Sequence, residues 1–381
     1  MEAPLIHPGF EAVADILASS TEGENPHGAQ LCVYAHGRPV VDLAMGGVTQ
    51  SSLTGVFSVS KGLGSLVIAK LVQDGVLDVT APVVSVWPEF AANGKGDVTI
   101  EQLLSHQAGL LGPVGGLPMQ DFLDSAPAAA ALAQLAPLWN PGQAFGYHAL
   151  SLGVFVEELV RRVTGRSAQE LYEEFFRAPI NAQAWLGLPQ EQEHRYIPVP
   201  SLQGEDFVDP FGVAGLSMNS TAGFLDADGN VSYDLMQVPN LLAVRQAGPV
   251  SVGGVASARG LATVYAAATT GIAGEHGHNA PILSDETTAN AARYRVFGVD
   301  CINAGIKGFG VGFMRPNPTN DFGSARAFGH DGANGTVAFA DPSWGVAFAY
   351  VPFSPQPGGN GTTAQRLTVA VRQAIMAGAL G

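Results

Sequence analysis

A helix is predicted to begin within the stretch Val56-Phe57-Ser58-Val59-Ser60-Lys61-Gly62. Apolar residues follow it at spacings of three and four, which is the pattern of a helix, and Gly75 is the expected C-cap. Residues three apart on a helix share a face, so Lys61 lies beneath Ser58. A serine hydroxyl needs a base to become a good nucleophile, and a helix N-terminus favours developing negative charge. We therefore predict that Ser58 is a nucleophile and Lys61 is its base partner.

The same residues also fit a helix with Ser58 as an ordinary N-cap and Lys61 in solvent. The chain has 4 lysines and 22 serines in 381 residues. Random placement would therefore give about 0.2 pairs at this spacing, and such a short motif needs independent support. The sequence contains no Gly-x-Ser-x-Gly, which argues against an α/β-hydrolase with a nucleophile elbow.

The composition is typical of a compact, loop-rich enzyme. Hydrophobic residues make up 46% of the chain and charged residues 13%, with 48 glycines and 25 prolines. The net charge of −15 argues against nucleic acid as a partner, and no Lys/Arg-rich run offers a patch for a membrane surface. With no leader-like N-terminus and no long apolar run, we expect a soluble, cytoplasmic protein. The choice between a monomer and a homo-oligomer is open.

Strand patterns lie near the two ends of the chain. Ala29–Tyr34 and Pro39–Ala44 flank the turn signal His36-Gly37-Arg38, which predicts an antiparallel hairpin. Thr336–Ala340 and Val346–Val351 predict a second hairpin with a longer turn. These end segments are expected to be neighbours in one antiparallel sheet.

Helical patterns lie near both ends of the chain, at His7–Ser19 and Gln365–Met376. The middle of the chain is also mostly helical: one helix is predicted from about Leu152 to Gly165, and capping boxes at Thr99 and Ser167 predict two further helix starts. We predict an α/β fold with an antiparallel sheet flanked by helices, formed by residues 1–80 and 250–381. Residues 81–249 are predicted to form a mainly helical lobe, with the active site between the two lobes.

Two further segments could supply side chains to such a site. Pro141-Gly142-Gln143-Ala144-Phe145-Gly146-Tyr147-His148 precedes a helix, and a tyrosine there can point its hydroxyl into a cleft; a packed loop tyrosine is the alternative. Phe328-Gly329-His330-Asp331-Gly332-Ala333-Asn334-Gly335 leads into a strand. A glycine-rich edge strand lets the backbone approach a substrate closely, and an ordinary turn is the alternative.

The order of Ser-x-x-Lys, a tyrosine motif and a Lys/His-x-Gly strand resembles the serine β-lactamase/penicillin-binding-protein superfamily. Local sequences are similar to the family VIII carboxylesterases, which are class C β-lactamase-like esterases. These are Val56-Phe57-Ser58-Val59-Ser60-Lys61-Gly62, Leu71-Val72-Gln73-Asp74-Gly75, Leu103-Leu104-Ser105-His106-Gln107-Ala108-Gly109-Leu110 and Phe328-Gly329-His330-Asp331-Gly332. The resemblance covers about residues 7 to 378 and implies a β-lactamase/DD-peptidase-like fold.

The resemblance also implies roles for individual residues. Ser58 would be the acylated nucleophile, and Lys61 and Tyr147 would share a proton relay. His330-Asp331-Gly332 would occupy the Lys-Thr-Gly position of the superfamily, where it would contact substrate. The backbone amides of Ser58 and Ala333 would form the oxyanion hole. The implied activity is a serine carboxylesterase acting on a small-molecule ester.

Two departures from the class C pattern bear on the substrate. Ala149 stands where β-lactamases have the Asn of Tyr-x-Asn, and His330 stands where they have Lys. Both lost groups would help to bind a β-lactam, so we expect small, largely apolar esters. Without a neighbouring cation, either burial lowers the pKa of Lys61 or Tyr147 carries more of the base role. The alternatives are a β-lactamase, a D-alanyl-D-alanine peptidase or an acyltransferase on the same scaffold, and a non-catalytic binding protein.

The remaining candidates carry less weight. Trp344 could line the acyl pocket, with a packing role as the equal alternative. His106 is expected to be a structural histidine at a helix end. The segment Glu275-His276-Gly277-His278 lacks a partner cluster with ligand spacing, so no metal or other cofactor is expected. Cys32 and Cys301 are expected to be two buried thiols.

Overall fold

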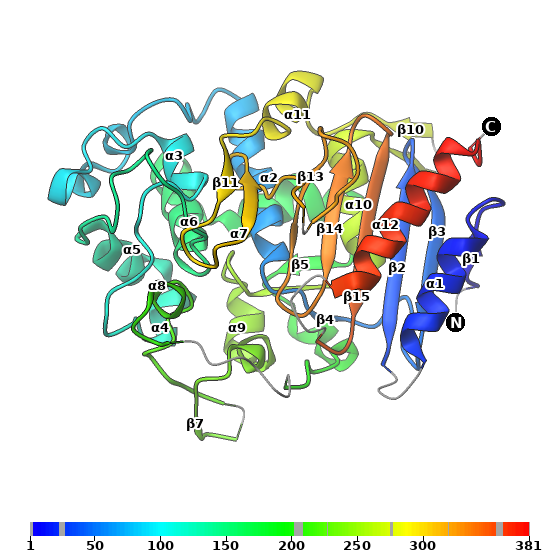
Figure 1. Cartoon of the computed structure of the whole chain (residues 1–381), viewed down its shortest axis with the longest axis horizontal. Helices are drawn as coiled ribbons and strands as arrows, with labels where there is room; N and C mark the ends of the chain where they lie inside the picture. The colour runs from blue at the N-terminus through cyan, green and yellow to red at the C-terminus, as the bar shows by residue number, and fades with distance from the viewer. Residues whose placement is uncertain are drawn as a thin grey trace.

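A six-stranded antiparallel sheet forms the right half of the molecule in Figure 1. The computed structural model describes residues 3–22, 27–201, 209–226, 228–274, 277–318, 320–355 and 361–380. The strand order is β1 (Leu5–Ile6), β3 (Arg38–Met45), β2 (Ala29–Ala35), β15 (Val346–Pro352), β14 (Val337–Asp341) and β13 (Phe328–Asp331). Both predicted hairpins are present, as β2–β3 and β14–β15. Phe348 of β15 pairs with Val33 of β2, which confirms that the two ends of the chain are neighbours in one sheet.

Each face of the sheet is covered by helices. The alternation of side chains along β15 places Phe348 and Tyr350 on one face, beneath α1 (Glu11–Thr21) and α12 (Gly361–Met376). Ala347 and Ala349 point to the other face, toward α10 (Ala258–Thr269). Because these alanines are small, α10 can pack closely on the sheet. The strand is therefore buried on both faces, and the expected antiparallel sheet flanked by helices is confirmed.

The helix predicted at Ser58 is α2 (Val59–Gln73), and it lies at the centre of the protein. All of its residues except Lys70, Val72 and Gln73 are buried. It contacts β13, α6 (Ser151–Thr164), α7 (Ala168–Tyr172) and α11 (Asp285–Ala291). The alternative of a solvated Lys61 is excluded, because its side chain is 0% exposed.

Mostly helical structure lies on the other side of α2 (Figure 1). It includes α3 (Ile100–Leu104), α4 (Met119–Leu123), α5 (Ser125–Ala133), α8 (Val213–Ser217) and α9 (Leu242–Ala247). Short 3₁₀ helices lie at Val83–Ser85, Pro88–Gly94, Ala178–Ile180, Gln190–Arg195 and Leu235–Asn240, and a short π-helix lies at Glu173–Arg177. The predicted capping boxes at Thr99 and Ser167 are both formed, and α6 ends at Gly165 with a left-handed φ of 71°.

Short strands in small sheets of two or three complete the described structure. They are β4 (Thr54–Gly55), β8 (Gly254–Ala256) and β5 (Ala184–Leu186) in one small sheet, β6 (Phe224–Leu225) with β7 (Val231–Ser232), β9 (Ile272–Gly274) with β10 (Gly277–Asn279), and β11 (Val296–Val299) with β12 (Ile306–Phe309). The six-stranded sheet takes its strands from residues 5–45 and 328–352, while the boundaries of the two lobes stay a prediction.

The two cysteines differ in their exposure. Cys32 is buried, but Cys301 is exposed, so the prediction of two buried thiols is wrong for Cys301; neither forms a disulfide. Glu275 and His276 lie outside the described residues. In the described ranges no helix has the length and apolar character needed to cross a membrane.

Candidate active site

Ser58 stands at the start of α2 on a strained turn. Its side chain does not cap the helix, and Phe57 before it has a left-handed φ of 49°, which is uncommon for a residue with a side chain. Ser60 holds this turn: its Oγ donates to the Phe57 carbonyl (2.5 Å) and accepts from the Gly254 amide (2.8 Å). The hydroxyl of Ser60 therefore makes its hydrogen bonds with the backbone, whereas Ser58 Oγ faces Lys61.

Lys61 is the partner of Ser58, as its position three residues later on the helix predicts. Its Nζ donates to Ser58 Oγ (2.9 Å) and to the carbonyl of Ser251 (2.9 Å). Burial lowers the pKa of Lys61 to about 7, against a smaller opposing effect of the charge on Asp331. Of the two ways of obtaining an unprotonated base, burial of Lys61 is the one that the geometry favours.

Ser251 was missed by the sequence analysis, although it fixes Lys61. Its Oγ donates to the carbonyl of Leu150 (2.5 Å) and accepts from the amide of Gly153 (2.8 Å), both at the start of α6. The preceding amide, Val250, donates to the buried carboxyl of Glu157 (2.8 Å) on the same helix. The contribution of Ser251 to Lys61 is a backbone carbonyl, which leaves no signal in the sequence.

Tyr147 lies beside this pair. Its hydroxyl interacts with Ser58, and Nζ of Lys61 lies 5.3 Å from the centre of its ring. The ring stacks on Phe309, with centroids 5.9 Å apart and planes at 12°. Burial raises the pKa of Tyr147 well above its ordinary value, so the hydroxyl keeps its proton at neutral pH. The structure thus brings Ser58, Lys61 and Tyr147 together.

The backbone of Tyr147 is fixed by two residues that the sequence analysis did not single out. The carboxylate of Asp300 accepts the Tyr147 amide (3.1 and 3.3 Å). The hydroxyl of Ser217 in α8 donates to the Tyr147 carbonyl (2.5 Å) and accepts from the amide of Ala149 (2.9 Å). Both come from distant parts of the chain, so only the folded structure connects them to Tyr147.

His330 and Asp331 lie on the edge strand β13. His330 is fully buried, and its Nδ1 contacts the carbonyl of Asp331 (2.7 Å); burial lowers its pKa, so the ring is neutral at pH 7. Burial by itself would raise the pKa of Asp331. The contact with His330, the charge of Lys307 and a hydrogen bond from Asn320 (2.8 Å) outweigh it and lower that pKa to about 2. The pair therefore carries one negative charge at neutral pH.

The turn after β13 docks against the segment that precedes Ser58. A Cβ on Gly332 would lie 2.6 Å from the carbonyl of Val56, so only glycine fits there. The side chain of Asn334 donates to the carbonyl of Gly55 (3.1 Å). In the described part of the chain, the amides of Ser58 and Ala333 donate to no other group. Both amides are thus free to bind an oxygen of a ligand.

Comparison with known proteins matches almost the whole chain. The family model described as Beta-lactamase matches residues 13–372. The chain belongs to the beta-lactamase family. Among curated proteins it is similar to Esterase/beta-lactamase LipL of Mycobacterium tuberculosis, with 31% identity over 368 residues, covering 90% of this chain and 81% of LipL.

Solved structures are similar to this chain over nearly its full length. EstA from Arthrobacter nitroguajacolicus Rue61a has a TM-score of 0.92 and 44% identity, covering 99% of each chain. A family VIII carboxylesterase has a TM-score of 0.84 and 29% identity, covering 98% of this chain and 100% of its own. A penicillin-binding protein homologue from Caulobacter crescentus has a TM-score of 0.84 and 30% identity, covering 98% and 99%. The resemblance stated from the sequence and the β-lactamase/DD-peptidase-like fold are confirmed.

Trp344 lies away from the site formed around Ser58. It lies in the turn between β14 and β15, whereas Ala333 lies in the turn between β13 and β14. Successive turns of an antiparallel sheet lie at opposite ends of the strands. Trp344 packs instead with Phe322, Phe339 and Ile375, on the α12 side of the sheet. The expectation that it lines an acyl pocket is wrong, and the packing alternative holds.

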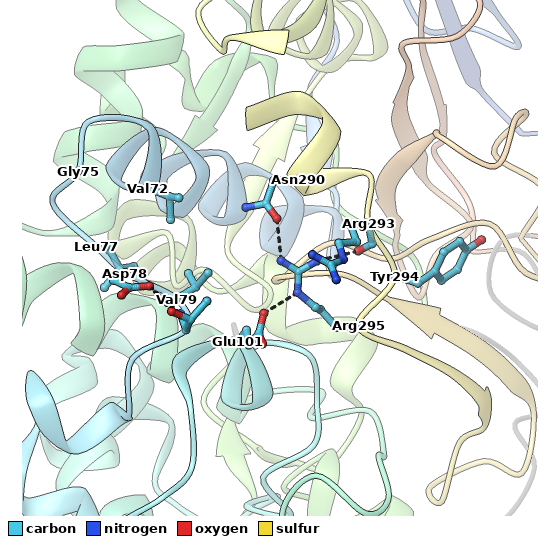
Figure 2. A pocket seen from close by; sticks show the side chains of 11 residues that line it. Val72, Gly75, Leu77, Asp78, Val79, Glu101, Asn290, Arg293, Tyr294 and Arg295 are labelled. Carbon is cyan, nitrogen blue, oxygen red and sulfur yellow. Dashed lines mark hydrogen bonds and ion pairs between the residues drawn. The ribbon is translucent and has the colours of Figure 1, made fainter. Parts of the chain in front are cut away.

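A hollow of about 610 Å³ lies at the opposite end of α2 from Ser58 (Figure 2). Gly75 lies in its wall, and the guanidinium of Arg295 there donates to Glu101 (2.7 Å) and Asn290 (2.7 Å). At 1.5 Å per residue, α2 separates this hollow from Ser58 by roughly 20 Å. The hollow is therefore not the catalytic site of the beta-lactamase fold; the Arg295–Glu101 pair in it ties α3 to the segment after α11.

Proposed function

We propose that this protein is a serine carboxylesterase that hydrolyses small, largely apolar esters through an acyl-enzyme on Ser58. The observation that carries the proposal is the 2.9 Å contact between Nζ of the buried Lys61 and Oγ of Ser58. With its pKa lowered to about 7, Lys61 can lose its proton near neutral pH and act as a base. The names of EstA, the family VIII carboxylesterase and LipL agree with this activity.

In acylation, Ser58 Oγ attacks the carbonyl carbon of the ester, and Lys61 takes the hydroxyl proton. The free amides of Ser58 and Ala333 bind the carbonyl oxygen as it becomes negative. A donor of this kind is worth on the order of 3 kcal/mol in the transition state. The C–O bond to the alcohol then breaks and leaves the acyl group on Ser58.

Tyr147 acts as the protonated member of the relay. Since burial raises its pKa, its hydroxyl donates a proton to the leaving alcohol oxygen and takes one from protonated Lys61. In deacylation, a water molecule gives its proton to Lys61 and attacks the acyl carbon. Return of that proton to Ser58 releases the acid and restores the enzyme.

The charge beside the nucleophile favours esters without a negative group. Asp331 is ionised and His330 neutral, so the strand that flanks the site presents a net negative charge. Like charges at short range repel, and a carboxylate on a substrate would be bound poorly there. β-Lactams and D-alanyl-D-alanine peptides both carry such a carboxylate, which makes these two activities the less favoured alternatives.

Neutral esters are expected to react faster than carboxylate-bearing ones. We expect kcat/KM for p-nitrophenyl acetate to exceed that for mono-p-nitrophenyl succinate by about tenfold or more, because repulsion by Asp331 acts on the second substrate only. Nitrocefin should be hydrolysed more slowly than either ester. Initial rates for the three substrates measure this, with the same assays at high salt as a control for surface charge. Nitrocefin turnover as fast as that of the acetate would contradict the proposal in favour of a β-lactamase.

The acid side of the pH–rate profile is expected to report Lys61. A base with a pKa of about 7 makes kcat/KM rise through pH 7 and level off above it. The negative charge of Asp331 raises the pKa of Lys61, so D331N should move this rise to lower pH. D15N, which removes an exposed carboxylate on α1, is the matched control and should leave the profile in place. A rise that stays at the same pH in D331N would mean that Lys61 is not the group that titrates.

A further inference from the structure

His106 holds the backbone on both sides of Tyr147. Its carbonyl accepts the amide of Gly146 (3.1 Å), and its Nδ1 accepts the amide of His148 (3.0 Å). These are the residues directly before and after Tyr147. The side chain of His106 is fully buried, so both hydrogen bonds are protected from water.

The conformation of His106 is unusual and fits this task. Its φ is 67°, in the left-handed region that residues with a side chain rarely occupy. A strained residue of this kind persists only where its surroundings hold it, and such residues cluster at functional sites. In this conformation, the backbone carbonyl and the ring of His106 both bind the loop that carries Tyr147.

The ring of His106 also packs against Tyr147. Their centroids are 5.1 Å apart, and Phe309 lies 4.3 Å from His106 and 5.9 Å from Tyr147. Since Nδ1 accepts a hydrogen bond, the ring is neutral with its proton on Nε2. Nε2 is buried with no hydrogen-bond partner in the described ranges, so the bond through Nδ1 is the one polar contact that the ring makes there.

We propose that His106 is a positioning residue for Tyr147, which keeps the tyrosine hydroxyl on Ser58 by fixing the loop from Gly146 to His148. This inference rests on the proposed function, since it assigns His106 to the relay of that reaction. It goes beyond the expected role of a structural histidine at a helix end. His106 does not touch the reacting atoms, so its loss should affect the rate of the chemical step more than the binding of substrate.

Substitutions at His106 can separate positioning from general support of the fold. In H106N the amide oxygen takes the place of Nδ1, and asparagine tolerates a positive φ. H106Q places its amide one bond further out, and H106A has no acceptor. We expect kcat for ethyl acetate, whose alkoxide leaving group needs the proton from Tyr147, to fall about 100-fold in H106A and H106Q, with KM within about threefold of the wild-type value. The kcat of H106N should be at least about tenfold higher than that of H106A or H106Q.

A double-mutant cycle with Y147F shows whether His106 acts through Tyr147. If it does, H106A should lower kcat no further in the Y147F background, because the hydroxyl that it positions is already gone. Circular dichroism and Tm of each variant check that the fold is retained. Equal fold-losses in both backgrounds, or H106N no better than H106Q, would overturn the proposal.

The remaining outcomes are also distinguishable. If H106A does not fold, the comparison of H106N with H106Q carries the test. An active wild-type enzyme with an unimpaired H106A overturns the positioning role and leaves the esterase proposal intact. A wild-type protein that is inert toward esters and is not labelled by a fluorophosphonate overturns the proposed function itself.

Discussion

Replacing Ser58 by alanine is expected to lower kcat for p-nitrophenyl acetate by at least about 10⁴-fold, because no acyl-enzyme can form without its hydroxyl. The same variant should lose covalent labelling by a fluorophosphonate, which intact-mass spectrometry of the protein would measure. The fold should be retained, since the Ser58 side chain caps no helix and Ser60 holds the turn.

A matched control tests whether the loss belongs to Ser58. Ser85 is an exposed serine away from α2, and S85A should keep both ester hydrolysis and labelling. If S58A retained full ester activity, the nucleophile would lie elsewhere and the proposed mechanism would be wrong. If wild-type protein were not labelled at all, the non-catalytic binding protein would become the better interpretation.

The second large effect is expected from Lys61. In K61M a side chain of similar length without an amine removes the base, and kcat should fall by about 10³-fold or more. The rise of kcat/KM through pH 7 should vanish with it, because the titrating group is gone. Stability should change little: the variant avoids burying an amine but leaves the Ser251 carbonyl without its donor, and these effects oppose each other.

The same substitution elsewhere on α2 provides the control. Lys70 lies near the end of the helix and pairs with Asp74 on the surface, so K70M should lose no more than about 1 kcal/mol of stability and keep the wild-type pH–rate profile. Residual K61M activity that still rises through pH 7 would show that another group is the base. Tyr147 would then be the first candidate, and an altered profile in Y147F would identify it.

The negative charge at Asp331 distinguishes this site from the Lys-Thr-Gly pattern, whose position the resemblance assigns to His330-Asp331-Gly332. With His330 neutral and Asp331 ionised, the strand lacks the cation that would attract a substrate carboxylate. The loss of the lysine is visible in the sequence, whereas the neighbours that hold Asp331 ionised are visible only in the structure. Burial of Lys61 then takes over the role of lowering its pKa.

Features governed by near neighbours were predictable from the sequence. The spacing of Ser58 and Lys61 on one helix, the two hairpins and the capping boxes at Thr99 and Ser167 all depend on residues a few positions apart. The order of the distant motifs resembles that of a known family, and this resemblance predicted that the motifs meet in one site. Closeness in sequence did not predict the position of Trp344. It follows β13 by only 13 residues, yet it lies at the opposite end of the strands from Ala333.

What the sequence determined by itself is the set of chemical groups: a serine with a lysine one helical turn away, a tyrosine in a glycine-rich loop, and a strand bearing His330 and Asp331. Only the tertiary structure decided how these groups behave. Burial lowers the pKa of Lys61, the carbonyl of Ser251 holds its amine, and His106 holds the loop of Tyr147. These effects come from desolvation and from backbone hydrogen bonds between distant segments, and neither leaves a pattern in the order of residues.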